Sequence, residues 1–505
     1  MGLSPMWSAD ASRRIGSRIV IEGELELQTP AHLGNGDGDD LTDMPLLVAP
    51  HDAKRPLLTG ASIAGAIRSA LREYEHGYGQ PASKESASVR LFGGLNSDPE
   101  GEQSPLVVDD AYGKEGTYGI ETRDEVNISR QSRTAADKKK FDRELWQAGT
   151  IFPLRFELLI CDSGDPTYPS MLKHALATAL ARFDDSSITI GARKRRGYGR
   201  VRPKLETWRV TTFNFTKSEG LKGLISWLAF ELDDSIKTNL EASPTIEPYE
   251  KWRASLSHSS APLLDARRYF EMRATFNLNG SLLIRSGGGK GDTGPDVEHL
   301  RARQTNASIE PILSGTSLGG VLRARAAKIA NTIGKKQPDK ANALINGMFG
   351  VEMKNGVEPR ASRIIVEENI VERPPDSPDL VQSRVGIDRF TAGARETALF
   401  NEQPLFGDDK TNVKVNVGLR NPQCGEIGML LLLLKDLWTG DLPLGGESSV
   451  GRGRLIGASA ELTHRFDGKT LTWKLDHAGD ELSITGGDQA SLEMYVAALN
   501  THLES

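Results

Sequence analysis

Four consecutive basic residues, Arg193 to Arg196, lie inside a glycine-rich stretch that could bind a polyanion. The stretch reads GARKRRGYGRV over residues 191–201, and from Arg193 to Lys204 the chain has seven Lys or Arg and no acid. Glycines let the backbone turn its N–H groups toward a phosphate, while arginine adds charge and a bidentate fork. Taken alone, the stretch could equally be a solvated turn.

A second copy of this loop, GGESSVGRGR over residues 445–454, follows 254 residues later. Two further landmarks recur at nearly the same offset. TGASIAGAIRSAL at residues 59–71 matches SGTSLGGVLRARA at 314–326, and LFG at 91–93 matches MFG at 348–350. Three landmarks in one order at one period predict a duplicated domain. We place the copies at residues 15–210 and 265–465, with a connector at 211–264 and a C-terminal tail at 466–505.

The composition is that of a globular protein with a large core. The chain has 505 residues, 38% of them hydrophobic and 26% charged, and a net charge of −6. Two cysteines without a CxxC pair favour a reducing, cytoplasmic location and disfavour a disulfide framework. The longest apolar run, residues 429–434, is too short for a bilayer, so we expect no membrane partner. ATP-binding, serine-hydrolase and zinc-protease motifs are missing from the sequence.

The elements that must position the loop repeat as well. Each copy opens with an alternating strand, at residues 17–27 and 274–283, and continues into a helix for which we expect Ser62 and Ser317 as N-caps. Further strands are expected at 151–160, 413–419 and the tail's LTWKL, and helices at 169–183 and the C-terminal end; residues 426–438 fit a helix and a strand about equally. This order predicts an α+β fold with helices on one face of each sheet.

In combination, these motifs resemble the RAMP superfamily. The xGxSxxGxxR helix start, the L/M-FG tripeptide and the late glycine loop are, more narrowly, similar to the backbone subunits of type III CRISPR effector complexes, here as a type III-D-like fusion of two. The resemblance implies a modified ferredoxin-like (RRM-like) domain per copy, each with a thumb-like hairpin. It also implies three kinds of partner: guide CRISPR RNA, target RNA and other subunits of the complex.

The resemblance further implies catalytic aspartates that cleave target RNA. The family's aspartate precedes the first helix, and Asp43 in LTDMP lies 17 residues before Gly60. Asp296 lies 19 residues before Gly315, with Asp292 as its rival. A carboxylate can bind a divalent cation, here a loosely held Mg or Mn ion. It can also accept the 2′ proton, whose removal makes the ribose oxygen a nucleophile. A solvated loop acid is the alternative interpretation of both.

The expected RNA contacts cover both loops, both helix starts and two hairpins, at residues 121–143 and 384–407. Ala64 and Gly319 stand where the family often has a phosphate-binding Lys, so this contact could pass to Arg68 and Arg323. Tyr198 and Phe390 could stack on bases, while we interpret His32 and His299 as structural. The expected RNA-binding residues are Ser62, Arg68, Arg130, Arg193, Lys194, Arg195, Arg196, Gly197, Tyr198, Gly199, Arg200, Ser317, Arg323, Arg389, Gly445, Gly446, Ser448, Arg452, Gly453 and Arg454.

Three functions fit this sequence. The first is a subunit that binds guide RNA along its length and cleaves target RNA as an endoribonuclease. The second is the same scaffold without cleavage. The third is an endoribonuclease that processes CRISPR RNA. Duplication favours a filament segment over the third function, because processing needs one site per product.

Overall fold

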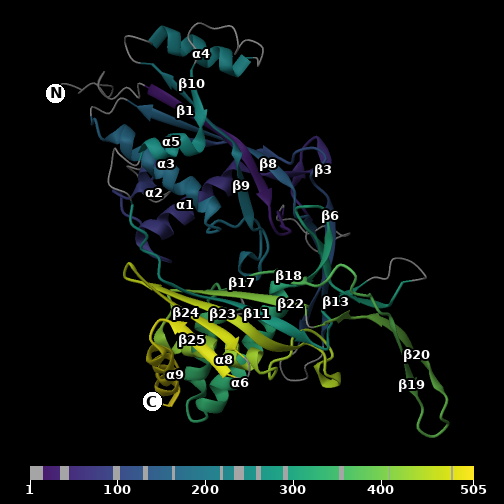
Figure 1. Ribbon diagram of the computed structural model, residues 1–505. Coiled ribbons are helices and arrows are strands. Elements are labelled where there is room, and N and C mark those ends of the chain that lie inside the picture. Colours follow the sequence, from purple (N-terminus) through teal and green to yellow (C-terminus); the bar gives the residue numbers. More distant parts are fainter. Residues whose placement is uncertain are drawn as a thin grey trace.

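A computed structural model describes residues 15–34, 45–94, 103–128, 135–161, 165–215, 220–232, 244–256, 263–287, 294–351, 358–408, 410–478 and 481–504. The chain forms two bodies, one above the other in Figure 1, and each is built around its own sheet. No helix in these ranges is long and apolar enough to cross a bilayer.

The first body contains the first copy and the connector. Its elements are β1 (Ile15–Leu27), β2 (Val48–Ala49), β3 (Asp52–Leu58), α1 (Gly60–His76), α2 (Ala87–Phe92), β4 (Leu106–Val108), β5 (Ala111–Tyr112), β6 (Ile120–Ile128), β7 (Ala135–Trp146), β8 (Ile151–Cys161), α3 (Tyr168–Asp184), the 3-10 turn η2 (Lys194–Arg196), β9 (Val201–Asn214), α4 (Gly220–Leu232), β10 (Thr245–Pro248) and α5 (Tyr249–Leu256).

The second body contains the second copy and the tail. Its elements are β11 (Tyr269–Asn279), β12 (Ser281–Leu282), β13 (Arg285–Gly287), β14 (Val297–His299), β15 (Arg301–Arg303), β16 (Ile309–Leu313), α6 (Gly315–Ile333), α7 (Pro338–Phe349), β17 (Ile364–Val366), β18 (Asn369–Glu372), β19 (Gln382–Ile387), β20 (Ala394–Gln403), β21 (Leu405–Phe406), β22 (Asn412–Arg420), α8 (Cys424–Trp438), η3 (Ser448–Val450), β23 (Arg454–Phe466), β24 (Lys469–Ala478), β25 (Glu481–Gly486) and α9 (Gln489–Glu504).

The two sheets have the same antiparallel arrangement of four central strands. In the first body, β1 lies between β8 and β9, and β4 pairs with β8. In the second, β11 lies between β22 and β23, and β17 pairs with β22. The order of elements along the chain is also the same, strand–helix–strand–strand–helix–strand. This arrangement confirms the α+β prediction and the duplication.

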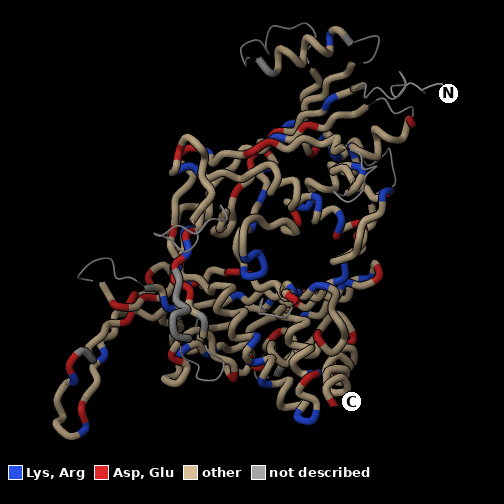
Figure 2. The backbone as a smooth tube through the Cα atoms, turned by 180° about the vertical axis from the view of Figure 1, so that it is seen from behind, with Lys and Arg blue, Asp and Glu red and all other residues tan. Residues whose placement is uncertain are grey.

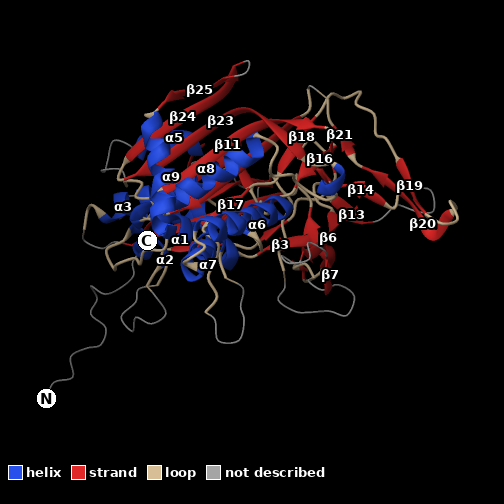
Figure 3. Ribbon diagram, turned by 90° about the horizontal axis from the view of Figure 1, so that it is seen from below, coloured by secondary structure: helices blue, strands red, loops and turns tan. Residues whose placement is uncertain are grey.

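Each body buries its own hydrophobic core between the sheet and the helices on one of its faces. Alternate residues of β1, Ile19 and Ile21, point into the first core together with α1 and α3, and the connector helix α5 joins this core through Trp252. The second core lies under α6, α7, α8 and α9, which gather on one face of the sheet (Figure 3). In the first body α4 packs on the opposite face, with the Trp227 ring against Phe213.

The helices that open each copy begin three residues earlier than we predicted. The N-cap of α1 is Thr59, whose side-chain oxygen accepts the Ser62 N–H at 3.2 Å, and Ser314 caps α6 through the Ser317 N–H at 3.3 Å. Ser62 and Ser317 as N-caps are therefore wrong. The helix begins at a glycine because any larger residue would clash here: a Cβ on Gly60 would lie 2.1 Å from the Val108 carbonyl oxygen. Glycine lets the first helical turn touch the strand.

The ambiguous segment near residue 426 is a helix. Gln423 and Glu426 form a capping box at the start of α8, and Lys435 lies in its last turn. Its apolar residues pack against the sheet, α6 and α9. The similarity of residues 425–427 to 149–151, which favoured a strand, concerned only three residues.

The first copy's glycine loop forms part of the joint between the two bodies. The Arg196 carbonyl oxygen lies 2.3 Å from where a Cβ of Gly315, the first residue of α6, would be, and the Gly197 backbone lies against Glu368. Polar contacts that cross the joint include those of Arg420 with Glu73 at 3.0 Å, Arg200 with Glu367 at 2.9 Å, and Arg123 with Glu368. Figure 2 shows basic residues gathered where the bodies face each other.

Candidate nucleic-acid interface

The two glycine loops have the same backbone despite different side chains. Arg193 and Glu447 precede the 3-10 turn in the left-handed conformation, with φ 54° and 59°, and Gly197 and Gly451 end it with φ 86° and 90°. Two residues later, a Cβ on Gly199 would lie 1.8 Å from the Ile190 carbonyl oxygen; the matching distance for Gly453 and Leu444 is 1.9 Å. The glycines therefore fix one loop shape that both copies share.

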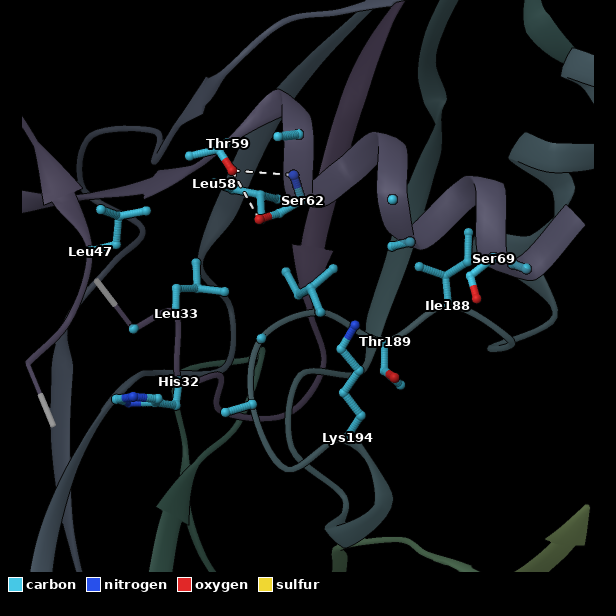
Figure 4. Close-up of a pocket in the computed structure, with 18 of the residues that line it drawn as sticks. His32, Leu33, Leu47, Leu58, Thr59, Ser62, Ser69, Ile188, Thr189 and Lys194 are labelled. Carbon is cyan, nitrogen blue, oxygen red and sulfur yellow. Dashed lines mark hydrogen bonds between the residues drawn. The ribbon is translucent and has the colours of Figure 1, made fainter. Parts of the chain in front are cut away.

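A groove of about 960 Å³ lies beside the first loop. The start of α1 forms one wall, through Thr59, Ser62 and Gly65, and η2 contributes Lys194 and Arg195. Figure 4 shows the Lys194 side chain extending into this space and Ser62 bordering it. Arg420 of the second body also lines the groove, so the groove extends to the joint between the bodies.

Two cations of η2, the exposed Lys194 and the half-buried Arg195, line this groove, while the half-buried Arg196 next to them lies against Gly319 of α6. Within the described ranges, Lys194, Arg195 and Arg196 form no ion pair, and Nη1 of Arg196 is buried without a hydrogen-bond partner. Burial lowers the pKa values of Lys194 and Arg196 and brings that of Arg195 to about 10. Buried charges normally have partners. An anion in the groove would compensate Lys194 and Arg195, which fits the phosphates of a nucleic acid.

The other predicted residues of the first loop have structural partners. Arg193 pairs with Glu125 at 2.7 Å, and Arg200 pairs with Glu367 across the joint. The Tyr198 ring is 1% exposed beneath the Arg123 guanidinium, and burial raises the pKa of its hydroxyl to about 12. Tyr198 cannot stack on a base, which corrects our prediction.

Arg68 and Arg323 link two of the repeated motifs to each other. Each guanidinium donates a 3.0 Å hydrogen bond to the carbonyl oxygen of the glycine in the L/M-FG tripeptide, Gly93 or Gly350. At Gly319, where the family often has a lysine, the space for a side chain is filled by Arg196: its Nη1 lies 1.8 Å from where a Cβ of Gly319 would be. Arg68 and Arg323 therefore have a structural role in each copy, and Arg196 occupies the space at Gly319, while the phosphate contact of Arg68 and Arg323 stays a prediction.

The second loop differs from the first in charge. Ser448 and Arg454 are exposed, Gly445 and Gly446 lie against the Leu283 carbonyl oxygen, and η3 carries no Lys or Arg. Arg452 is 4% exposed and binds Glu402 at 3.0 Å, so its guanidinium does not face RNA and this prediction is also corrected. The second loop has the shape of the first but not its basic cluster.

Asp296 lies at the base of the β19–β20 hairpin. Its carboxylate is exposed and accepts the Asn401 N–H from β20 at 2.7 Å. Arg389 and Phe390 lie at the turn of this hairpin, which projects from the body in Figure 1, and Phe390 is 99% exposed. Asp43, Arg130 and the rival Asp292 lie outside the described residues.

A divalent cation would need ligands beyond the protein side chains described here. Groups of three or more His, Cys, Asp or Glu suited to a metal are missing from the described ranges. An exposed carboxylate such as that of Asp296 nevertheless suits a hard cation, which commonly combines one or two carboxylates with phosphate oxygens and water. Asp296 therefore fits a metal that is shared with RNA.

Both histidines near the expected catalytic loops are buried. His32 donates from Nδ1 to the Glu144 carbonyl oxygen at 2.9 Å, and burial lowers its pKa. His299 is 3% exposed, receives the Ile284 N–H at Nδ1 and donates from Nε2 to the Ile312 carbonyl oxygen. Burial lowers the pKa of His299 to about 4. The contacts of His299 are those of a neutral ring with a structural role.

Acid should therefore destabilise the second body through His299. The pKa of His299 is about 4 in the folded protein and about 6.5 in the unfolded chain. The neutral ring therefore contributes up to about 3 kcal/mol to the free energy of unfolding above pH 6.5, and this contribution is lost as the pH falls toward 4. We expect the free energy of unfolding of His299→Gln to fall less over this range than that of the unaltered chain. Denaturant unfolding at several pH values measures this. His51→Gln, at an exposed position, should keep the original slope.

Fold and site together define a tandem pair of α+β domains joined through a glycine loop. The RAMP superfamily model matches residues 24–202 and again 275–456, more than half of the chain. The chain therefore belongs to the RAMP superfamily, with one domain in each half. This superfamily binds RNA and is associated with CRISPR type III complexes. No curated protein matches the chain at a significant level.

Proposed function

We propose that this protein is a backbone subunit of a type III CRISPR ribonucleoprotein, a type III-D-like fusion whose two domains bind consecutive parts of one guide RNA in the cytoplasm. The observation that carries the proposal is the basic cluster of η2, with Lys194 and Arg195 in the groove and Arg196 beside α6, none of which has an ion pair within the described ranges. A continuous RNA backbone would place phosphates along this groove, which runs from α1 to the joint.

The shared sheet supports a finer assignment of the fold. In each copy the last strand pairs with the first, the first with the third, and the third with the second. With two helices on one face, this is the split β-α-β order of a modified ferredoxin-like domain. The β6–β7 and β19–β20 hairpins would be the thumbs. Val385, Ile387 and Phe390 leave the second hairpin with an exposed apolar surface suited to insertion between bases.

Cleavage of target RNA is the proposed activity, with Asp43 and Asp296 as metal-assisted catalytic residues. Support comes from the position of Asp296, which is exposed beside a hairpin that could separate target bases. A bound cation would stabilise charge on the scissile phosphate, and Asp296 would hold it there. A purely structural subunit is the alternative. Processing of CRISPR RNA by histidine has less support, since His299 is buried and hydrogen-bonded at both ring nitrogens.

Guide binding can be tested by removing the three cations. In the variant with Lys194, Arg195 and Arg196 all changed to alanine, we expect the Kd for guide-length RNA to rise at least about 100-fold at low salt. The plot of log K against log salt should become shallower by about 2, because each single-strand phosphate contact contributes about 0.7. Fluorescence anisotropy over a salt series measures both.

The matched control removes three exposed cations away from the groove, Lys222, Lys251 and Arg253. It changes the net charge equally, so a general electrostatic effect would weaken binding in both variants. An equal loss in both, or an unchanged slope in the groove variant, would contradict guide binding at this groove.

A further inference from the structure

Each glycine loop is attached to the hairpin of its own copy at corresponding positions. The hairpins share one register: Glu125 faces Phe141 as Arg384 faces Phe400, and Arg123 faces Arg143 as Gln382 faces Glu402, with all four offsets equal to 259. Glu125 therefore corresponds to Arg384, and Arg143 to Glu402. In the loops, Arg193 corresponds to Glu447.

In the first copy a carboxylate of the hairpin holds the loop. Glu125, 8% exposed on β6, lies 2.7 Å from Nη1 of Arg193 in the loop and 3.6 Å from Nε of Arg143 on β7. The Tyr198 hydroxyl donates to the same carboxylate at 3.4 Å. One acid thus lies between a loop cation and a strand cation.

In the second copy the same three positions carry the opposite charges. Arg384 on β19 lies 3.0 Å from Glu447 in the loop and 3.1 Å from Glu402 on β20, which is fully buried. Arg452, at the position of Tyr198, adds 3.0 Å and 3.3 Å contacts to Glu402 and Glu447. Cations, Arg384 and with it Arg452, now lie between a loop acid and a strand acid.

Attachment alone does not require opposite polarity, since either arrangement holds a loop on a hairpin. The reversal matters only if a loop meets the wrong hairpin. Arg193 would then face Arg384, or Glu447 would face Glu125, and each would bring two like charges together in a site with little water. Like charges in such a site are strongly unfavourable, and exchange of equivalent elements is a characteristic failure of repeated domains.

We propose that Arg193, Glu125 and Arg143, together with Glu447, Arg384 and Glu402, are positioning residues whose opposite polarity makes each glycine loop dock only on the hairpin of its own copy. The consequence for guide binding rests on the proposed function, because the first of these loops carries the cations of the groove. The effect on folding does not depend on RNA.

The test reverses the charges of the first copy. Arg193→Glu alone should lower the Tm by about 5 °C or more, since it brings two carboxylates together. The triple variant Arg193→Glu, Glu125→Arg, Arg143→Glu takes the polarity of the second copy and should regain most of this loss. Both copies now have the same polarity, so refolding from denaturant should give several-fold more misassembled monomer and exchanged dimer, measured by size-exclusion chromatography and light scattering.

Reversal of an exposed pair, Lys414→Glu with Glu372→Lys, is the control and should refold as the unaltered chain does. Two results overturn the proposal: a triple variant that refolds as well as the original, or one whose Tm stays as low as that of Arg193→Glu. Neither result touches the proposed function. Failure of the unaltered chain to bind guide RNA would overturn that function and leave the refolding comparison intact.

Discussion

Asparagine in place of Asp296 is expected to remove one cut from the regular ladder of target-RNA fragments, and Asp43→Asn the neighbouring cut. Asparagine has nearly the size of aspartate, and its side-chain oxygen can still accept the Asn401 N–H. The substitution therefore removes the charge while the loop keeps its place. Loss of a carboxylate that binds a cation or accepts a proton should slow that cut by about 10²–10⁴-fold.

The complex assembled with guide and labelled target RNA, resolved on a sequencing gel, measures this. Removal of divalent metal by EDTA should abolish every cut while target binding persists. Glu298→Gln is the matched control, because it neutralises a carboxylate two residues along the chain, in the middle of β14. If the Asp43 and Asp296 variants both cut at every position, the subunit is structural, which is the alternative function.

Alanine at Arg123 should produce the largest loss of stability at a single side chain of the joint. Arg123 is 3% exposed and binds Glu368 of the second body with both terminal nitrogens, one of them at 3.0 Å, and Glu121 at 2.7 Å. Its removal leaves two carboxylates in a dry site without a cation. Breaking a buried pair in this way costs about 3–5 kcal/mol.

A double-mutant cycle with Arg123→Met and Glu368→Leu, followed by denaturant unfolding, separates the pair from its surroundings. We expect the double variant to be more stable than the sum of the two single losses predicts, because apolar side chains leave no charge uncompensated. Arg268→Ala breaks the exposed pair with Asp467 and should cost less than about 1 kcal/mol. Additive losses in the cycle would show that Arg123 and Glu368 are not energetically coupled.

Periodicity and repeated motifs were enough to predict the duplication, the α+β class and most of the strands and helices. They failed at the helix starts, because Gly60 is needed for contact with β4 and a sequence does not show which backbone lies opposite. They left residues 426–438 open, because the capping box at Gln423 and Glu426 was not recognised.

The candidate site was predictable only in part. The basic cluster was evident from residues 193–196, but the burial of Tyr198 depends on the hairpin that covers it, and that contact spans 73 residues. The reversed ion pairs were invisible for a related reason. An alignment of the copies sets Arg193 beside Glu447, which looks like lost similarity until Glu125 and Arg384 are seen in contact with them.

The joint between the two bodies is asymmetric. The first body contributes its glycine loop and the second body contributes the start of α6, and these two surfaces differ in shape and chemistry. The counterparts of these two surfaces are η3, with Val450 60% exposed, and the start of α1 beside the groove. If copies of the chain stacked through these counterparts as the two bodies do, the contact would be heterologous and addition would have no intrinsic stopping point. The length of such a stack would then be set from outside, by a bound nucleic acid or by end pieces that offer only one of the two surfaces.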